Sequence, residues 1–179
     1  MENKINWVID PTHSEISFKV KHLMISNVKG VFGEFESTVT TEGEDFSSAA
    51  INVRIKSASI NTGTADRDNH LRSADFFDAE NFSDISLEST SLKKLSDDEF
   101  ALAGDLTIRG ITKPVTLDVE FGGIMNDPWG NVKAGFTVSG KINRKDWGLN
   151  WNAALEAGGV LVSDEVKINC EVEYLQVKS

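Results

Sequence analysis

Three histidines and one cysteine are among the side chains that could bind a metal ion or act as a nucleophile. His13, His22 and His70 lie far apart in the sequence, with no pair at the i, i+4 spacing and no cysteine beside them. A metal site needs its ligands on elements that bring them together, so we expect structural histidines and no metal. Cys170 lies at an inward position of an alternating segment without basic neighbours, which is typical of an inert core thiol.

The segment DRDNHLRSADFFDAENF, residues 66–82, combines closely spaced charged side chains with one histidine and three phenylalanines. Its acidic and basic side chains could act as general acid and base on a bound substrate. The alternative, which we favour, is that they form salt bridges and caps that hold a short helix in place. Thr64 is a suitable N-cap for that helix, and its first-turn carboxylates suit a helix N-terminus.

A second polar segment, NRKDWGLNW, covers residues 143–151. We expect Arg144 and Asp146 to clamp the end of a strand while Trp147 and Trp151 pack over it. The chain has no Gly-x-Ser-x-Gly nucleophile elbow and no glycine-rich phosphate loop. No motif in the sequence therefore identifies a reaction.

The elements that must position these residues are strands. Apolar and polar residues alternate with a period of two in eight segments, separated by turn-forming residues. These segments are 15–23, 31–39, 51–57, 85–89, 100–108, 115–121, 132–142 and 166–174. Short links between them predict antiparallel pairing. Phe32 breaks the alternation of its segment, which indicates a bulge or an outward contact.

Eight antiparallel strands with one apolar face form either a sandwich or a closed barrel. We favour the barrel because closure leaves no unpaired edge, and eight strands can enclose one small ligand. The predicted fold is an all-β, eight-stranded, antiparallel, lipocalin-like barrel with a short helical insertion between strands 3 and 4. Residues 1–179 are expected to form one domain.

The composition limits the partners. The formal net charge of −10 argues against nucleic acid and disfavours electrostatic docking on an anionic membrane. No apolar run approaches the ~18 residues of a membrane-spanning helix. The first residues show no apolar signal-peptide core, so the expected location is cytoplasmic, or periplasmic if the N-terminus was trimmed.

Several blocks of the sequence resemble the YceI-like family of lipocalin-like, polyisoprenoid-binding proteins. In order, they are IDPTHSEISFKVKHLMISNVKGVFGEF, DRDNHLRSADFFDAENF, LTIRGITKPVTLDV, INRKDWGLN and GGVLVSDEVKINCEVE. The resemblance extends from about Trp7 to Leu175. It implies a barrel around a long apolar tunnel that holds a prenyl chain with its polar head toward the opening. It also implies a homodimer, since members often dimerise, and no settled catalytic activity.

The function that we expect is non-enzymatic binding, storage or transport of a long-chain isoprenoid or similar amphiphilic lipid, for example an isoprenoid quinone. No cofactor is expected besides this lipid, and membrane contact would be transient without stable insertion. The expected ligand-binding residues are Phe18, Val20, His22, Phe35, Val53, Arg67, His70, Leu71, Phe76, Phe136, Val138 and Trp147.

Two alternatives stay open. The first is an enzyme acting on a prenylated lipid with the polar residues 66–70 over the barrel mouth. The second is a protein-binding barrel whose centre is filled by its own side chains. Gly33, Ser37, Gly104 and other small residues argue against the filled barrel because they leave room inside.

Overall fold

The computed structural model describes residues 3–153 and 161–177. The strands are β1 (Lys4–Ile9), β2 (Glu15–His22), β3 (Ser26–Phe32), β4 (Phe35–Glu42), β5 (Asp45–Lys56), β6 (Ile60–Asn61), β7 (Asp84–Lys94), β8 (Glu99–Ile108), β9 (Ile111–Asn126), β10 (Val132–Asn143) and β11 (Val162–Gln176). The helix is α1 (Ala65–Arg72), and short 3-10 turns are η1 (Pro11–His13), η2 (Ser57–Ser59) and η3 (Arg144–Trp147). Within these described ranges, no helix has the length and apolar character needed to cross a membrane.

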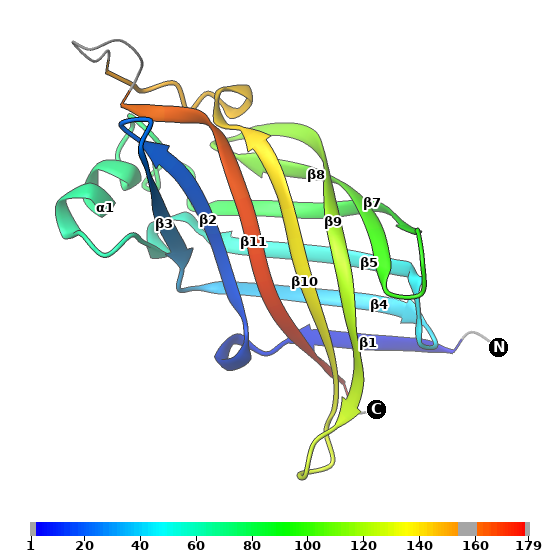
Figure 1. Ribbon diagram of the computed structural model, residues 1–179. Coiled ribbons are helices and arrows are strands. Elements are labelled where there is room, and N and C mark those ends of the chain that lie inside the picture. The colour runs from blue at the N-terminus through cyan, green and yellow to red at the C-terminus, as the bar shows by residue number, and fades with distance from the viewer. Residues whose placement is uncertain (1–2, 154–160, 178–179) are drawn as a thin grey trace.

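The strands close into a barrel (Figure 1). The closed ring runs β1-β4-β5-β7-β8-β9-β10-β11, with every neighbouring pair antiparallel, and β11 returns to β1. This confirms the predicted eight-stranded antiparallel barrel. The predicted helical insertion is also confirmed, since α1 lies between β5 and β7 in the chain.

Strand β11 is shared between two partners on the same edge. Its last residues pair with β1, and residues 162–171 pair with β2. The chain breaks between β1 and β2 because Asp10 caps η1 and Pro11 starts that turn. Sequence alternation located β2 but missed β1, whose six residues are flanked by polar positions.

The predicted strand 31–39 is two strands in the structure. Strand β3 ends at Phe32 and pairs with β2, whereas β4 starts at Phe35 and pairs with β1 and β5. Even-numbered residues point inward at the end of β3 and odd-numbered residues point inward in β4. Phe32 therefore lines the cavity together with Ser37 and Val39. The irregularity at Phe32 is therefore a strand break rather than an outward contact.

The interior contains two hydrophobic clusters, one toward each end of the barrel. The cluster around Trp7, Phe46 and Phe100 defines what we call the Trp7 end. The other cluster, around Ile60, Phe76 and Trp147, lies next to α1 and defines the helix end. Segments far apart in sequence meet in both clusters, so the barrel core depends on ring closure.

Candidate functional site

A cavity of about 250 Å³ lies inside the barrel between the two clusters. Every strand of the closed ring contributes to its wall, and almost all of the contributing side chains are apolar. Along β11 the wall extends from Val166 to Tyr174, which is about 26 Å along the strand and ~20 Å along the axis of a barrel with ordinary tilt. The cavity is elongated and suits an apolar ligand with a chain-like shape.

The hydroxyl groups on the cavity wall are already hydrogen-bonded within the protein. Ser17 Oγ donates to the Asn169 carbonyl at 2.6 Å, and Ser37 Oγ donates to the Asn52 carbonyl at 2.8 Å. The Tyr174 hydroxyl bonds Ser37 Oγ at 2.7 Å. Burial raises the pKa of Tyr174 to about 12, so the phenol stays neutral at ordinary pH. Apolar cavities of this kind stay dry and accept apolar molecules.

Aromatic rings fill the Trp7 end. The ring of Phe46 lies 5.4 Å from that of Trp7 and 5.1 Å from those of Phe121 and Phe136, measured between centroids. The indole Nε1 of Trp7 donates to Thr41 Oγ1 at 3.1 Å, which satisfies its buried N–H. This end of the barrel is therefore closed by packing.

The segment from α1 to residue 77 covers the helix end. Leu71, Phe76 and Phe77 all line the cavity. Phe77 contacts the ring of Phe32 edge-on at 6.0 Å, and Phe76 lies 5.4 Å from the ring of Trp151. The insertion thus places apolar side chains against the cavity, as expected for a lid.

The charged residues of this segment are bonded to their own surroundings. Asp68 accepts from the N–H and the hydroxyl of Thr62 at 2.8 and 2.6 Å, and Arg67 donates to the same residue at 2.7 Å. His70 Nε2 lies 2.8 Å from Asp75. Thr64 occupies the N-cap position without a side-chain cap bond. These contacts support the interpretation of the cluster as anchors, but the expected Thr64 cap bond is absent and Arg67 bonds Thr62 rather than a carboxylate.

One charged side chain lies on the cavity wall among the described residues. Arg144 is 3% exposed and lines the cavity. Its guanidinium donates to the carbonyls of Ser163 at 2.9 Å, Val162 at 3.4 Å and Leu149. Burial lowers the pKa of Arg144, and Asp164 at 3.9 Å opposes that effect. The predicted strand clamp exists, but its carboxylate is Asp164 and not Asp146.

Most of the expected ligand-binding residues line the cavity. Those on the wall are Phe18, Val20, Val53, Leu71, Phe76, Phe136 and Val138. They come from three different strands, β2, β5 and β10, and from the helical insertion, so only the tertiary fold brings them together. That they contact a ligand stays a prediction.

The other expected residues lie elsewhere. Phe35 packs against the cluster at the Trp7 end and is not on the cavity wall. His22 is half-buried at the end of β2, and Arg67 is exposed. His70 stacks edge-on with Trp151 at 4.6 Å, outside the wall. Trp147 is buried beneath the wall and donates Nε1–H to the Leu106 carbonyl at 2.8 Å.

Many wall residues were not among the expected ligand-binding residues, and three of them show why. Phe46 lies in a segment that was not assigned to a strand, because Ser47 and Ser48 interrupt the alternation after it. Ser37 was expected to face inward only as a small residue that leaves room, and Arg144 only as part of a strand clamp, because polar side chains do not indicate an apolar wall. Only the tertiary contacts that satisfy these polar groups allow them to face the interior.

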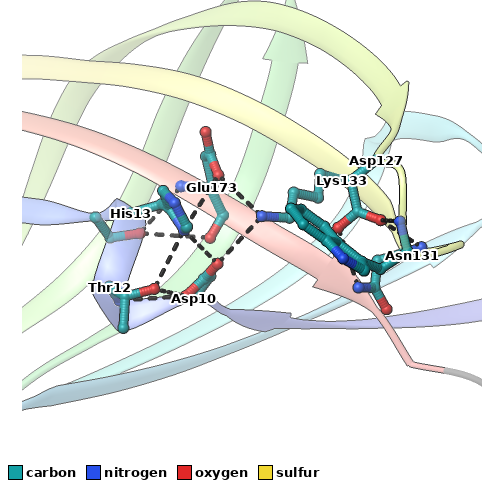
Figure 2. Close-up of polar contacts among 9 residues, drawn as sticks. Asp10, Thr12, His13, Asp127, Asn131, Lys133 and Glu173 are labelled. Atoms are coloured by element: carbon teal, nitrogen blue, oxygen red, sulfur yellow. Dashed lines mark hydrogen bonds and ion pairs between the residues drawn. The ribbon is translucent and has the colours of Figure 1, made fainter.

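A group of ionisable side chains lies where η1, β10 and β11 meet (Figure 2). His13 Nδ1 lies 2.8 Å from Asp10 and 4.0 Å from Glu173. The ammonium of Lys133 lies 3.4 Å from Asp10 and 3.6 Å from Glu173. The ligand atoms of Asp10, His13 and Glu173 are within 4.8 Å of one another, a spacing compatible with a metal ion. Because the ammonium of Lys133 already pairs with both carboxylates, we interpret the group as an ion-pair network.

Comparison with known proteins gives consistent results. The family model described as a YceI-like domain matches residues 7–174. The UPF0312 protein SA2479 of Staphylococcus aureus strain N315 is 42% identical over 170 residues, covering 94% of this chain and 96% of that protein. A crystal structure of the Campylobacter jejuni YCEI protein has a TM-score of 0.77 at 34% identity, covering 88% of this chain and 90% of that one.

A more distant structure shows the same fold. It is a polyisoprenoid-binding domain from Saccharophagus degradans, implicated in plant cell wall breakdown, with a TM-score of 0.70. Its sequence is 14% identical, and the match covers 96% of this chain and 98% of that one. The barrel is therefore retained across sequences with few shared residues.

Proposed function

This chain belongs to the YceI-like family, and from this premise we propose that its barrel binds the hydrocarbon tail of a long-chain isoprenoid or a similar amphiphile without converting it chemically. The observation that carries the proposal is the elongated cavity with a nearly continuous apolar wall. The polyisoprenoid-binding domain of the same fold supports an isoprenoid as the class of ligand. An isoprenoid quinone is one candidate within this class.

The free energy of binding is expected to come from the tail. Each CH₂ that leaves water for an apolar site contributes about 0.8 kcal/mol, so a five-carbon isoprene unit contributes roughly 3–4 kcal/mol before ordering costs. A hydrogen bond to the head group contributes about 0.5–1.5 kcal/mol net. Affinity should therefore follow tail length, while the head group affects orientation.

A binding role is also supported by the contacts of the polar insertion. The side chains of Arg67 and Asp68 are hydrogen-bonded to Thr62, that of His70 is bonded to Asp75, and none of them lines the cavity. The enzyme alternative needs at least one of them to reach a bound lipid. If His70→Ala and Asp68→Asn leave every measured turnover of added prenyl lipids unchanged, that alternative loses its sequence support.

The proposal is tested by extracting the purified protein with organic solvent and identifying the extract by mass spectrometry. We expect a near-stoichiometric long-chain lipid, and we expect added polyprenyl alcohols to bind more tightly as units are added. Absence of lipid together with no binding of added polyprenyl compounds would refute the proposal.

A matched pair of variants links binding to the cavity. Val138→Phe adds atoms to the wall, whereas Val8→Phe adds the same atoms to a side chain that is 39% exposed on β1. We expect the first variant to carry less lipid per folded molecule and the second to carry as much as the wild type. Thermal unfolding of both variants confirms that folded protein is compared.

A further inference from the structure

We propose that the protein docks on an anionic phospholipid bilayer through a row of lysines and an apolar hairpin tip beside the helix end of the barrel. This inference deepens the proposed function, on which its biological meaning rests, by naming the surface with which the lipid is exchanged. Vesicle binding can nevertheless be measured whether or not the cavity holds a ligand.

The first observation is a row of like charges across four neighbouring strands. In the register of the sheet, Lys19 on β2 lies opposite Lys29 on β3 and Lys167 on β11, and Lys167 lies opposite Lys141 on β10. All four side chains are exposed. Like charges placed directly opposite destabilise a sheet, so this arrangement needs an explanation other than stability.

Charge pairing compensates only the outer members of this lysine row. Lys29 lies 3.3 Å from Glu15, and Lys141 lies 3.9 Å from Glu165. Lys19 and Lys167, in the middle of the row, have no ion-pair partner among the residues that the structure describes. Residues 16–33 contain three lysines and one histidine and no acidic residue, in a chain of net charge −10.

The second observation is the apolar tip that follows the row along β2. Leu23, Met24 and Ile25 join β2 to β3, and their side chains are 39%, 50% and 84% exposed. Leu23 and Met24 have φ values of 55° and 63°, a left-handed conformation that is unfavourable for such side chains. Three consecutive exposed apolar residues in a strained turn are typical of a contact site.

The tip lies next to the cavity. Val20 on β2 and Val162 on β11 both line the cavity, and the N–H of Leu23 donates to the Leu161 carbonyl at 2.9 Å. In Figure 1 the turn between β2 and β3 lies on the side of the barrel that carries α1. Insertion of the tip at the bilayer interface would therefore bring the helix end toward the membrane.

The charge of the partner follows from the lysines. Each lysine near an anionic leaflet multiplies the partition coefficient of the protein by about five. Apolar side chains at the tip insert at the boundary between head groups and acyl chains. The negative charge on the rest of the protein would be repelled by that leaflet, so binding requires the lysine row to face it. This orientation reconciles membrane contact with the acidic composition.

A second exposed apolar turn provides an internal comparison. Met125 at the end of β9 and Trp129 in the turn to β10 are 74% and 81% exposed. Their turn holds the carboxylate of Asp127, which accepts hydrogen bonds from the backbone N–H groups of Trp129 and Asn131. It has no lysine row beside it, so we do not expect it to bind the anionic surface.

The test is co-sedimentation of the full chain with vesicles of phosphatidylcholine alone or mixed with phosphatidylglycerol. We expect binding to the mixed vesicles only, and weaker binding at high salt because surface charges are screened. The double variant K19Q/K167Q should bind roughly 30-fold more weakly. The control K93Q/K113Q, which removes two exposed lysines outside the row, should bind like the wild type.

The apolar contribution is tested separately. Ile25→Ser should weaken vesicle binding roughly tenfold, and Trp129→Ser should leave it unchanged. The proposal is overturned by equal binding to both vesicle types, by absence of binding, by equal losses in K19Q/K167Q and its control, or by a loss confined to Trp129→Ser. Lipid extracted from the K19Q/K167Q variant reports independently on the proposed function and should match the wild type.

Discussion

Replacement of Arg144 by methionine tests whether a buried cation holds the segment after β10 against the start of β11. The guanidinium is the hydrogen-bond donor for three backbone carbonyls, those of Leu149, Val162 and Ser163. Methionine fills most of the same volume but donates no hydrogen bond, so these carbonyls lose their bonds to Arg144. The expected effect is a loss of stability with little change in packing.

The magnitude follows from the geometry. The bond to Val162 at 3.4 Å is long and weak, which leaves two strong charge-assisted bonds. Loss of such a bond costs about 1.5–3 kcal/mol, and two such losses add up to several kcal/mol. We therefore expect Arg144→Met to lower the free energy of unfolding by about 3–5 kcal/mol.

Urea unfolding followed by tryptophan fluorescence measures this loss, since Trp147 and Trp151 flank the clamp. The matched control is Lys145→Met, which removes a half-exposed ion pair to Asp164 at 3.4 Å and should cost no more than about 1 kcal/mol. Arg144→Lys keeps the charge but not the planar donor fork, so it should fall between the two. A loss below about 1 kcal/mol in Arg144→Met, or an equal loss in the control, would refute the clamp; if the Met variant does not fold, Arg144→Lys gives the measurement.

The remaining predictions concern acid stability, thiol reactivity and backbone packing. Burial raises the pKa of Asp10, but hydrogen bonds from its neighbours outweigh this effect and bring the pKa to about 2. The resulting stability, about 1 kcal/mol after solvent screening, is present above pH ~4 and lost between pH ~4 and ~2; acid titrations should show this loss in the wild type and not in Asp10→Asn. Burial raises the pKa of the Cys170 thiol to about 11, so Ellman's reagent at pH 8 should react about 100-fold more slowly with native than with unfolded protein; equal rates would contradict this. A Cβ on Gly104 would lie 2.8 Å from the Glu88 carbonyl oxygen, so Gly104→Ala should cost about 1–3 kcal/mol in urea unfolding, whereas Gly135→Ala, with open space around its Cβ, should cost less.

The barrel was predictable because alternation is a direct consequence of a one-sided core. In β11, for example, Ile168, Cys170 and Val172 line the cavity while Lys167 and Glu171 are exposed. Where the chain changes strand partner within two residues, alternation gave the wrong boundary. The break between Phe32 and Phe35 is such a place. Strand parity carried across it predicted Phe35 on the cavity wall, whereas Phe32 lines the cavity and Phe35 does not.

The site was predictable only for apolar residues. A wall position held by valine or phenylalanine follows from strand parity, as Val53 and Phe136 show. Arg144 could not be placed on the wall from sequence because its burial depends on hydrogen bonds to the carbonyls of Leu149, Val162 and Ser163. Tyr174 was placed facing inward, but its bond to Ser37 joins strands that no local pattern relates.

The sharing of β11 between β1 and β2 has a consequence for the order of folding. The ring closes through contacts between residues 7–9 and residues 174–176, almost a whole chain length apart. Such distant pairing makes loop closure slow, and on the ribosome it must wait until the last strand has emerged. Until then the nascent protein is an open sheet whose apolar concave face is uncovered. Pairing of β11 is therefore the step that commits the chain to its native state.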